Sequence, residues 1–110
     1  MTTPSESMEQ VTFLNWFERE YPGVFIHSIP NGYQLGHMQS QKAKREGMKK
    51  GPADLHVPRW QMYIEFKRVK GGKWSPEQEA YKQEVELGGG IYILAKGWED
   101  AVKQVQEKAP

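Results

Sequence analysis

Residues 53–68 read ADLHVPRWQMYIEFKR, and this stretch decides the fold. Two runs within it, 53–57 and 61–68, are rich in β-branched and aromatic residues and alternate in polarity, which is typical of strands. A proline-containing turn at 58–60 separates them. We therefore expect two antiparallel neighbours joined as a hairpin.

The second run of the hairpin places charged side chains on a single face. Glu65 and Lys67 are two residues apart and must point to the same side of a strand, whereas Ile64 and Phe66 point to the other side, towards a core. Asp54 opens the preceding strand, so its carboxylate can lie beside that of Glu65 across the pairing. Two carboxylates and an ammonium group are thus expected to converge.

This convergence indicates metal chemistry. Two carboxylates held close together raise each other's proton affinity unless a cation lies between them, and oxygen ligands suit Mg²⁺ or Mn²⁺. Such an ion can polarise a phosphodiester, while Lys67 can orient the attacking water or stabilise developing charge. The alternative is that Asp54 caps a turn, and that Glu65 and Lys67 are ordinary solvated residues on an amphipathic strand.

The remaining elements follow from periodicity and from helix-start and turn signals. Ser75, Pro76 and Gln78 form a good helix start, because serine can cap the helix and glutamine can complete a capping box. The expected elements outside the hairpin are a helix at 7–20, a strand at 24–29, a short helix at 40–48, a helix at 75–87, a strand at 91–95 and a helix at 98–107. The chain is therefore predicted to be α/β, with helices flanking a mixed sheet in which the 61–68 and 91–95 strands run parallel.

Charge is distributed unevenly along the chain. Ten of the fifteen basic residues lie within 42–73, where only three acidic residues oppose them, so this window carries +7 although the whole chain carries +1. A basic centre suits a polyanion, and neutralising phosphates is the main source of affinity for DNA. The predicted DNA contacts are Lys42, Lys44, Arg45, Lys49, Lys50, Lys70 and Lys73.

Length and composition bound the class of protein. The chain of 110 residues has no cysteine, which excludes disulfides and thiolate zinc sites, and it has no long apolar run. We expect an intracellular, cytoplasmic protein with a flexible N-terminus at 1–6 and one domain at 7–110. A core this small also favours a homodimer.

A series of short motifs gives the chain a family resemblance. In order along the sequence they are Glu9, Ile29-Pro30-Asn31-Gly32, Glu46-Gly47-Met48-Lys49-Lys50-Gly51, Asp54-Leu55, Ile64-Glu65-Phe66-Lys67, Gly71-Gly72-Lys73, Ser75-Pro76-Glu77-Gln78 and Gly97-Trp98-Glu99-Asp100-Ala101. With them the chain resembles the VRR-NUC domain, the virus-type replication-repair branch of the PD-(D/E)xK nucleases with a restriction-endonuclease-like core. One departure is that Ala53 precedes the aspartate where the family usually has proline, which here is Pro52.

The resemblance implies roles for individual residues. The matches to Asp54 and Glu65 bind the metal with the Phe66 carbonyl, and the match to Lys67 assists the attacking water. Glu9 matches an acid that can complete the metal site, although it could equally be solvated on its helix. Gln78 matches a polar residue that lines the site, and its part in the capping box is an alternative explanation.

The resemblance also implies a substrate and a partner. Small stand-alone members look like Holliday-junction resolvases and are implied to be homodimers that cut branched DNA. We therefore expect a structure-selective DNA endonuclease that acts in DNA repair on substrates such as four-way junctions. Two alternatives remain open, a non-catalytic DNA-binding module of the same fold and a nuclease of flaps or linear ends.

Overall fold

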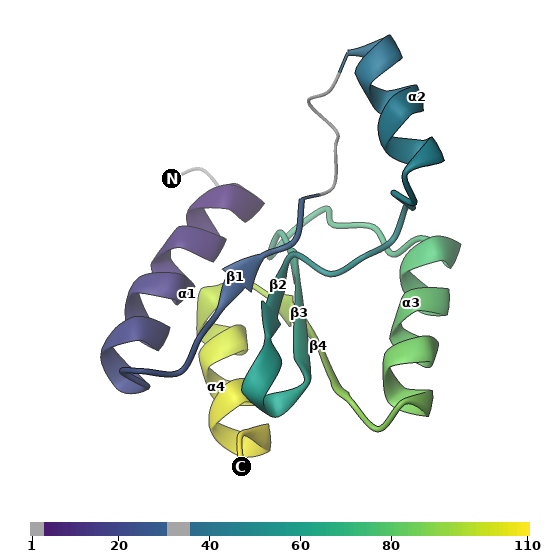
Figure 1. The fold of residues 1–110 in the computed structure, drawn as a ribbon. Coiled ribbons are helices and arrows are strands. Elements are labelled where there is room, and N and C mark those ends of the chain that lie inside the picture. The colour runs from purple at the N-terminus through teal and green to yellow at the C-terminus, as the bar shows by residue number, and fades with distance from the viewer. Residues whose placement is uncertain (1–3, 31–35) are drawn as a thin grey trace.

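The computed structural model describes residues 4–30 and 36–110, which form a four-stranded sheet with α-helices around it (Figure 1). In chain order the elements are α1 (Glu6–Glu20), β1 (His27–Ser28), α2 (His37–Arg45), β2 (Leu55–Val57), the 3-10 helix η1 (Pro58–Trp60), β3 (Met62–Lys67), α3 (Pro76–Leu87), β4 (Ile91–Lys96) and α4 (Trp98–Lys108). The predicted α/β class is confirmed.

The sheet has the order β1-β2-β3-β4 and mixes both strand directions. β1, β2 and β3 are antiparallel in sequence, and β4 runs parallel to β3, as the strand–helix–strand unit predicted. The predicted hairpin is present, with Leu55 opposite Ile64. Its turn is η1, and Gln61 closes it in the left-handed region with φ 50°.

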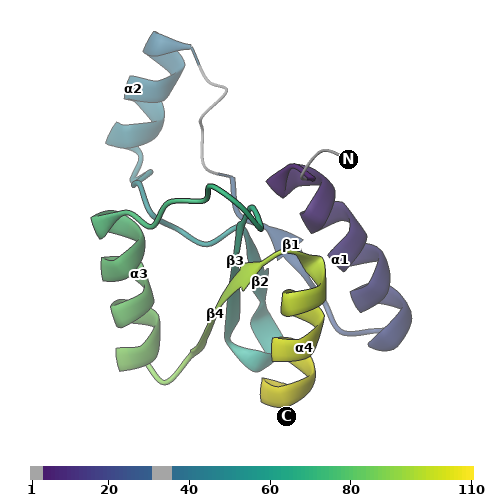
Figure 2. The ribbon, with the colours of Figure 1, turned by 180° about the vertical axis from the view of Figure 1, so that it is seen from behind.

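One face of the sheet is sealed by α1 and α4, which lie side by side over it (Figure 2). Phe13 and Phe17 of α1 are fully buried against this face, and the rings of Phe13 and Phe66 meet edge-on at 5.5 Å. The buried cluster consists of Phe13, Phe17, Leu55, Val57, Met62, Ile64, Phe66, Ile93, Ala95, Ala101 and Val105. Burial of these side chains is the main source of stability.

The opposite face is covered only in part by α3, which packs against β4 and reaches β3 through the Tyr63–Tyr81 ring contact. The helix begins as predicted. The Gln78 N–H donates to Ser75 Oγ at 3.1 Å, and the Ser75 N–H donates to Gln78 Oε1 at 3.0 Å. This reciprocal capping box fixes where the chain turns after β3.

Two predicted elements differ from those observed. The expected strand at 24–29 is reduced to His27–Ser28, because its partner β2 ends at Val57 and the next residue, Pro58, has no N–H to extend the ladder. The short helix expected at 40–48 runs instead over His37–Arg45 and projects away from the sheet (Figure 1). Asn31 and Gly32, part of one predicted motif, lie outside the described residues.

The first helix begins close to its expected start. α1 starts at Glu6, one residue before the predicted position. Ser5 caps this helix by accepting a hydrogen bond from the Met8 N–H at 3.1 Å.

Candidate active site

Asp54 lies just before β2, and three hydrogen bonds to backbone groups hold it in place. Its N–H donates to the Ile64 carbonyl at 2.9 Å, and its carbonyl accepts from the Ile29 N–H at 2.8 Å. Its carboxylate oxygen Oδ2 accepts from the Phe66 N–H at 2.7 Å. The last bond ties the carboxylate to β3, the strand that carries the other charged residues.

Glu65 and Lys67 project from β3 on the side away from the α1/α4 core. Lys67 Nζ lies 4.0 Å from Glu65 Oε2, and Glu65 is only 5% exposed. The strand alternation that predicted a shared face for these two residues is therefore observed. Together with Asp54 they form a compact group of two carboxyls and one ammonium.

The environment of the two carboxyls disfavours their charged forms. Burial, and then the charge of Asp54, raise the pKa of Glu65 to about 8, against an opposing effect of Lys67. Burial also raises the pKa of Asp54, although the hydrogen bond from Phe66 acts in the opposite direction. Within the described part of the chain, Glu65 Oε1 is buried and has no hydrogen-bond partner. The ammonium of Lys67 therefore does not offset the effect of burial on the two carboxyls.

A hard divalent cation would stabilise the charged forms of these two carboxyls. Mg²⁺ and Mn²⁺ prefer oxygen donors, and Mg²⁺ is commonly held by one or two carboxylates while water and substrate complete the shell. Among residues 4–30 and 36–110, no three His, Cys, Asp or Glu side chains are close enough to hold an ion. The carboxyls of Asp54 and Glu65 are the side-chain groups at this place that could hold such an ion.

A cleft of about 400 Å³ opens over these carboxyls. Its lining residues are Lys49, Lys50, Gly51, Pro52, Asp54, Glu65, Lys67, Lys73, Ser75 and Gln78. Three of the predicted DNA-contact lysines, Lys49, Lys50 and Lys73, thus border the same cleft as the carboxylates. Gln78 lines it too, while its side-chain oxygen serves the capping box of α3. Anionic substrates are favoured in such a cleft.

The other predicted DNA contacts lie outside this cleft. Lys42, Lys44 and Arg45 are exposed on α2, and Lys70 is exposed on the turn that follows β3. Phe66, expected to offer its carbonyl to the metal, has its side chain in the core and its N–H bonded to Asp54.

The structure does not bring Glu9 to the carboxyl pair. Glu9 is 4% exposed, and its carboxylate accepts a hydrogen bond from the Trp98 N–H at the start of α4. The sequence contained a signal for this placement, because Glu9, Phe13 and Phe17 recur every four residues and form the buried stripe of α1. The acid on α1 whose charge raises the pKa of Asp54 and Glu65 is Glu6.

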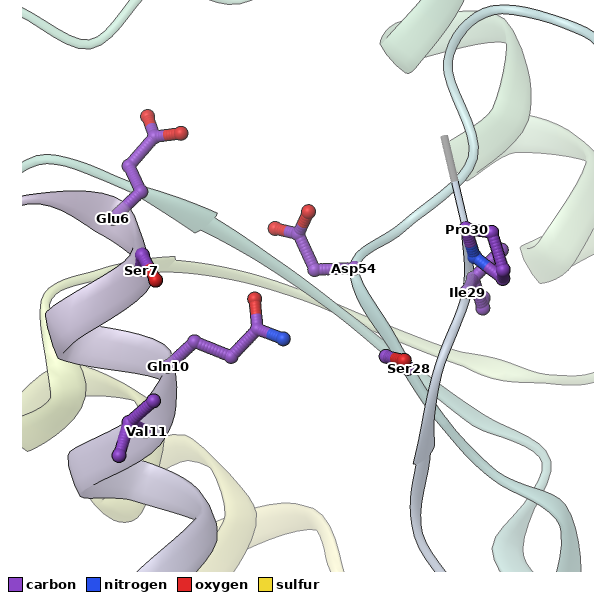
Figure 3. Close-up of a pocket in the computed structure, with 8 residues that line it drawn as sticks. All are labelled: Glu6, Ser7, Gln10, Val11, Ser28, Ile29, Pro30 and Asp54. Atoms are coloured by element: carbon purple, nitrogen blue, oxygen red, sulfur yellow. The ribbon is translucent and has the colours of Figure 1, made fainter. Parts of the chain in front are cut away.

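A second pocket, of about 560 Å³, shares Asp54 with the cleft (Figure 3). It is bounded by α1 and by the segment that follows β1. Its lining residues are Glu6, Ser7, Gln10, Val11, Ser28, Ile29, Pro30 and Asp54. Apart from Asp54, none of these side chains was predicted to belong to a site, because only the tertiary fold brings α1 beside β1 and Asp54.

None of the described helices combines the length and the apolar character needed to cross a membrane.

Comparisons with known proteins bear on the fold. No protein-family model matches the sequence, and no curated protein matches it. A solved structure of a VRR_NUC domain protein superposes with a TM-score of 0.83 at 22% identity, covering 99% of this chain and 91% of that chain. An agreement this extensive at such low identity shows a shared backbone architecture. The chain therefore has the fold of a VRR-NUC domain, as its motif series predicted.

Proposed function

We propose that this protein is a metal-dependent nuclease that hydrolyses phosphodiester bonds in DNA. One observation carries the proposal: Asp54, Glu65 and Lys67 meet in a lysine-lined cleft, and a buried carboxyl oxygen there has no hydrogen-bond partner in the described chain. Perturbed carboxyls of this kind in a cleft are typical of functional sites. The shared fold with a VRR_NUC domain protein supports the same conclusion.

Asp54 and Glu65 are the residues proposed to hold Mg²⁺ or Mn²⁺. Asp54 is pre-positioned by the Phe66 N–H, and Glu65 offers its unpartnered Oε1. The Phe66 carbonyl is the proposed backbone ligand, and Glu6 supplies the nearby acidic charge that the motif series had assigned to Glu9. When bound, the ion would polarise the phosphodiester and stabilise charge on its oxygens.

Lys67 is the proposed positioning group for the attacking water. Its ammonium lies 4.0 Å from Glu65 Oε2 and borders the cleft, so it can donate to a water or to a phosphate oxygen there. Gln78 lines the same cleft and has an amide nitrogen available to substrate, since its oxygen is used by Ser75.

Lys49, Lys50 and Lys73 are proposed to hold the phosphates next to the scissile bond. Lys42, Lys44, Arg45 and Lys70 extend the basic surface, and the residues of α2 do so on a helix that projects beyond the sheet (Figure 1). Binding through such contacts weakens as salt concentration rises.

Branched DNA and homodimerisation belong to the same proposal. A dimer would place two sites across a four-way junction, in line with the short chain and the resemblance. Light scattering at micromolar concentration is expected to report twice the chain mass of 12.7 kDa. A monomer at all concentrations tested would remove the two-site arrangement and favour flaps or linear ends as substrates.

The test is cleavage of labelled four-way junctions, flaps and linear duplexes with Mg²⁺, with Mn²⁺ and with chelator. Lys67→Ala is expected to lower the rate by about a hundredfold or more. Lys96→Ala is the matched control, because Lys96 stands opposite Lys67 in the strand register but is exposed and does not line the cleft. Equal activity in the two variants would overturn the proposed role of Lys67.

The same panel separates the enzyme from a DNA-binding module. Salt-sensitive binding without cleavage under either metal would show that the centre does not act in hydrolysis.

A further inference from the structure

The pocket in Figure 3 shares Asp54 with the lysine-lined cleft but differs from it in charge. Lys49, Lys50, Lys67 and Lys73 border the cleft, whereas the described residues that line the pocket include no Lys, Arg or His. Its charged groups are the carboxyls of Glu6 and Asp54. In the metal-free protein a phosphate is therefore favoured in the cleft and disfavoured in the pocket.

The volume of the pocket and the residues that line it suit an uncharged organic group. The volume of about 560 Å³ lies within the range of roughly 300–1,000 Å³ found for small-molecule sites. Val11 and Pro30 stand on opposite sides of the pocket, on α1 and after β1, and supply apolar walls (Figure 3). Ser28 adds a hydroxyl between them.

Gln10 is the polar group best placed to form hydrogen bonds with such a ligand. Its side chain extends from α1 across the pocket, with the amide end directed towards Asp54 and Ser28 (Figure 3). No hydrogen bond of this amide is found within residues 4–30 and 36–110. A primary amide offers one acceptor and two donors, which matches the edge of a nucleobase.

We propose that the pocket of Glu6, Gln10, Val11, Ser28, Pro30 and Asp54 receives the nucleoside flanking the scissile phosphate, and that Gln10 hydrogen-bonds its base. This inference rests on the proposed nuclease function. The phosphate lies on the lysine side of Asp54, and the neighbouring sugar and base pass to the other side. The base then packs between apolar walls, as extruded bases do in enzymes that act on single nucleotides.

The test compares natural DNA with DNA that lacks one base. The cut site is first mapped with wild-type protein, and a tetrahydrofuran abasic residue is then placed on either side of it. Gln10→Leu keeps the side-chain size and removes the hydrogen bonds. We expect it to lower kcat/KM at least fivefold on natural DNA and less than twofold on the DNA that is abasic at one of the two positions. Gln106→Leu, on the exposed surface of α4, is the control.

A binding measurement gives an independent reading. Fluorescence anisotropy with the same DNAs measures affinity in the Lys67→Ala background. Gln10→Leu should weaken the binding of natural DNA and should not weaken the binding of the DNA that is abasic at the relevant position. An equal penalty on all DNAs, or none, would overturn the nucleoside assignment. A change in Mn²⁺ affinity caused by Gln10→Leu, without base dependence, would overturn it as well, because Gln10 would then act on the metal centre and not on a base.

Failure of the nuclease proposal gives a different result. If wild-type protein cuts no DNA with Mg²⁺ or Mn²⁺, the abasic residue is moved along the strand and binding alone is measured. A position at which the Gln10→Leu penalty disappears would still support the pocket, and the absence of any such position would overturn it.

Discussion

The two faces of the sheet differ in what covers them and in what they carry. α1 and α4 seal one face, on which Ile64 and Phe66 have no exposed surface. The other face carries Glu65 and Lys67 from the same strand and borders the lysine-lined cleft. We call the first the sealed face and the second the open face. Neighbouring residues of β3 thus serve opposite purposes, since one set stabilises the fold and the other lies in the candidate active site.

The largest expected effect tests the open face. Glu65→Gln removes a proposed ligand while keeping the size of the side chain, so cleavage should fall by about a thousandfold or more. The metal-free protein should lose no stability at pH 8, because the variant cannot carry the disfavoured buried charge. Cleavage rates and urea denaturation of the same samples check both statements. A destabilised but active variant would show that Glu65 serves the fold.

The next effect tests the sealed face. Phe13→Ala removes a fully buried ring that contacts Phe66, and it should cost about 3–5 kcal/mol of unfolding free energy. Phe13→Leu, a milder change, should cost less and leave a folded protein whose Mn²⁺ affinity equals that of wild type. Calorimetry of unfolding and of Mn²⁺ binding measures the two quantities. An altered Mn²⁺ affinity in the leucine variant would contradict the separation of the two faces.

The pH dependence of stability should report on Glu65, the buried carboxyl of the open face. The pKa of Glu65 is raised from 4.5 to about 8, so between these values the folded protein holds more protons than the unfolded chain. The metal-free protein should therefore lose stability as pH rises through this window, by at most about 1.4 kcal/mol per pH unit for one group.

Metal binding should follow the opposite trend. Mn²⁺ needs the deprotonated carboxyl, so its affinity should rise up to about pH 8 and then level off. Glu65→Gln should weaken Mn²⁺ binding and flatten both profiles. A stability profile that is unchanged in this variant would assign the pH dependence to other groups.

Two acids on α1 offer a smaller and more local comparison. The Glu9 carboxylate accepts from the Trp98 N–H at the start of α4, so Glu9→Ala should cost about 1 kcal/mol of stability. Glu6 is exposed and lines the pocket beside Asp54, so Glu6→Gln should weaken Mn²⁺ binding without loss of stability. Denaturation and Mn²⁺ titration of both variants decide the matter. A loss of Mn²⁺ affinity confined to Glu9→Ala would restore the role that the motif series gave to Glu9.

Local signals were sufficient for much of the fold. The proline turn and the alternation of 53–68 predicted the hairpin, and Ser75, Pro76 and Gln78 predicted the start of α3. β1 was overpredicted, because its length is set by where β2 ends and not by its own β-branched residues.

The meeting of the two carboxyls and the lysine could be predicted because these residues share a hairpin. Asp54 directly precedes β2, and Glu65 and Lys67 lie on the neighbouring β3, so hairpin geometry alone brought them together. Glu6 and Gln10 come from a helix more than forty residues earlier in the chain. Their approach to Asp54 depends on the angle at which α1 crosses the sheet, and that angle is set by the packing of the core.

The smallest expected effect concerns the lysines that border the cleft. Lys73→Ala removes one proposed phosphate contact, so the slope of log Kd against log salt should decrease by about one, with a modest loss of affinity for every DNA tested. Lys103→Ala, an exposed position on α4 at the sealed side, should leave the slope unchanged. Fluorescence anisotropy over a series of salt concentrations measures the slope. An equal change in the two variants would mean that DNA binding depends on the overall charge of the protein. That result would contradict the assignment of the open face as the DNA-binding surface.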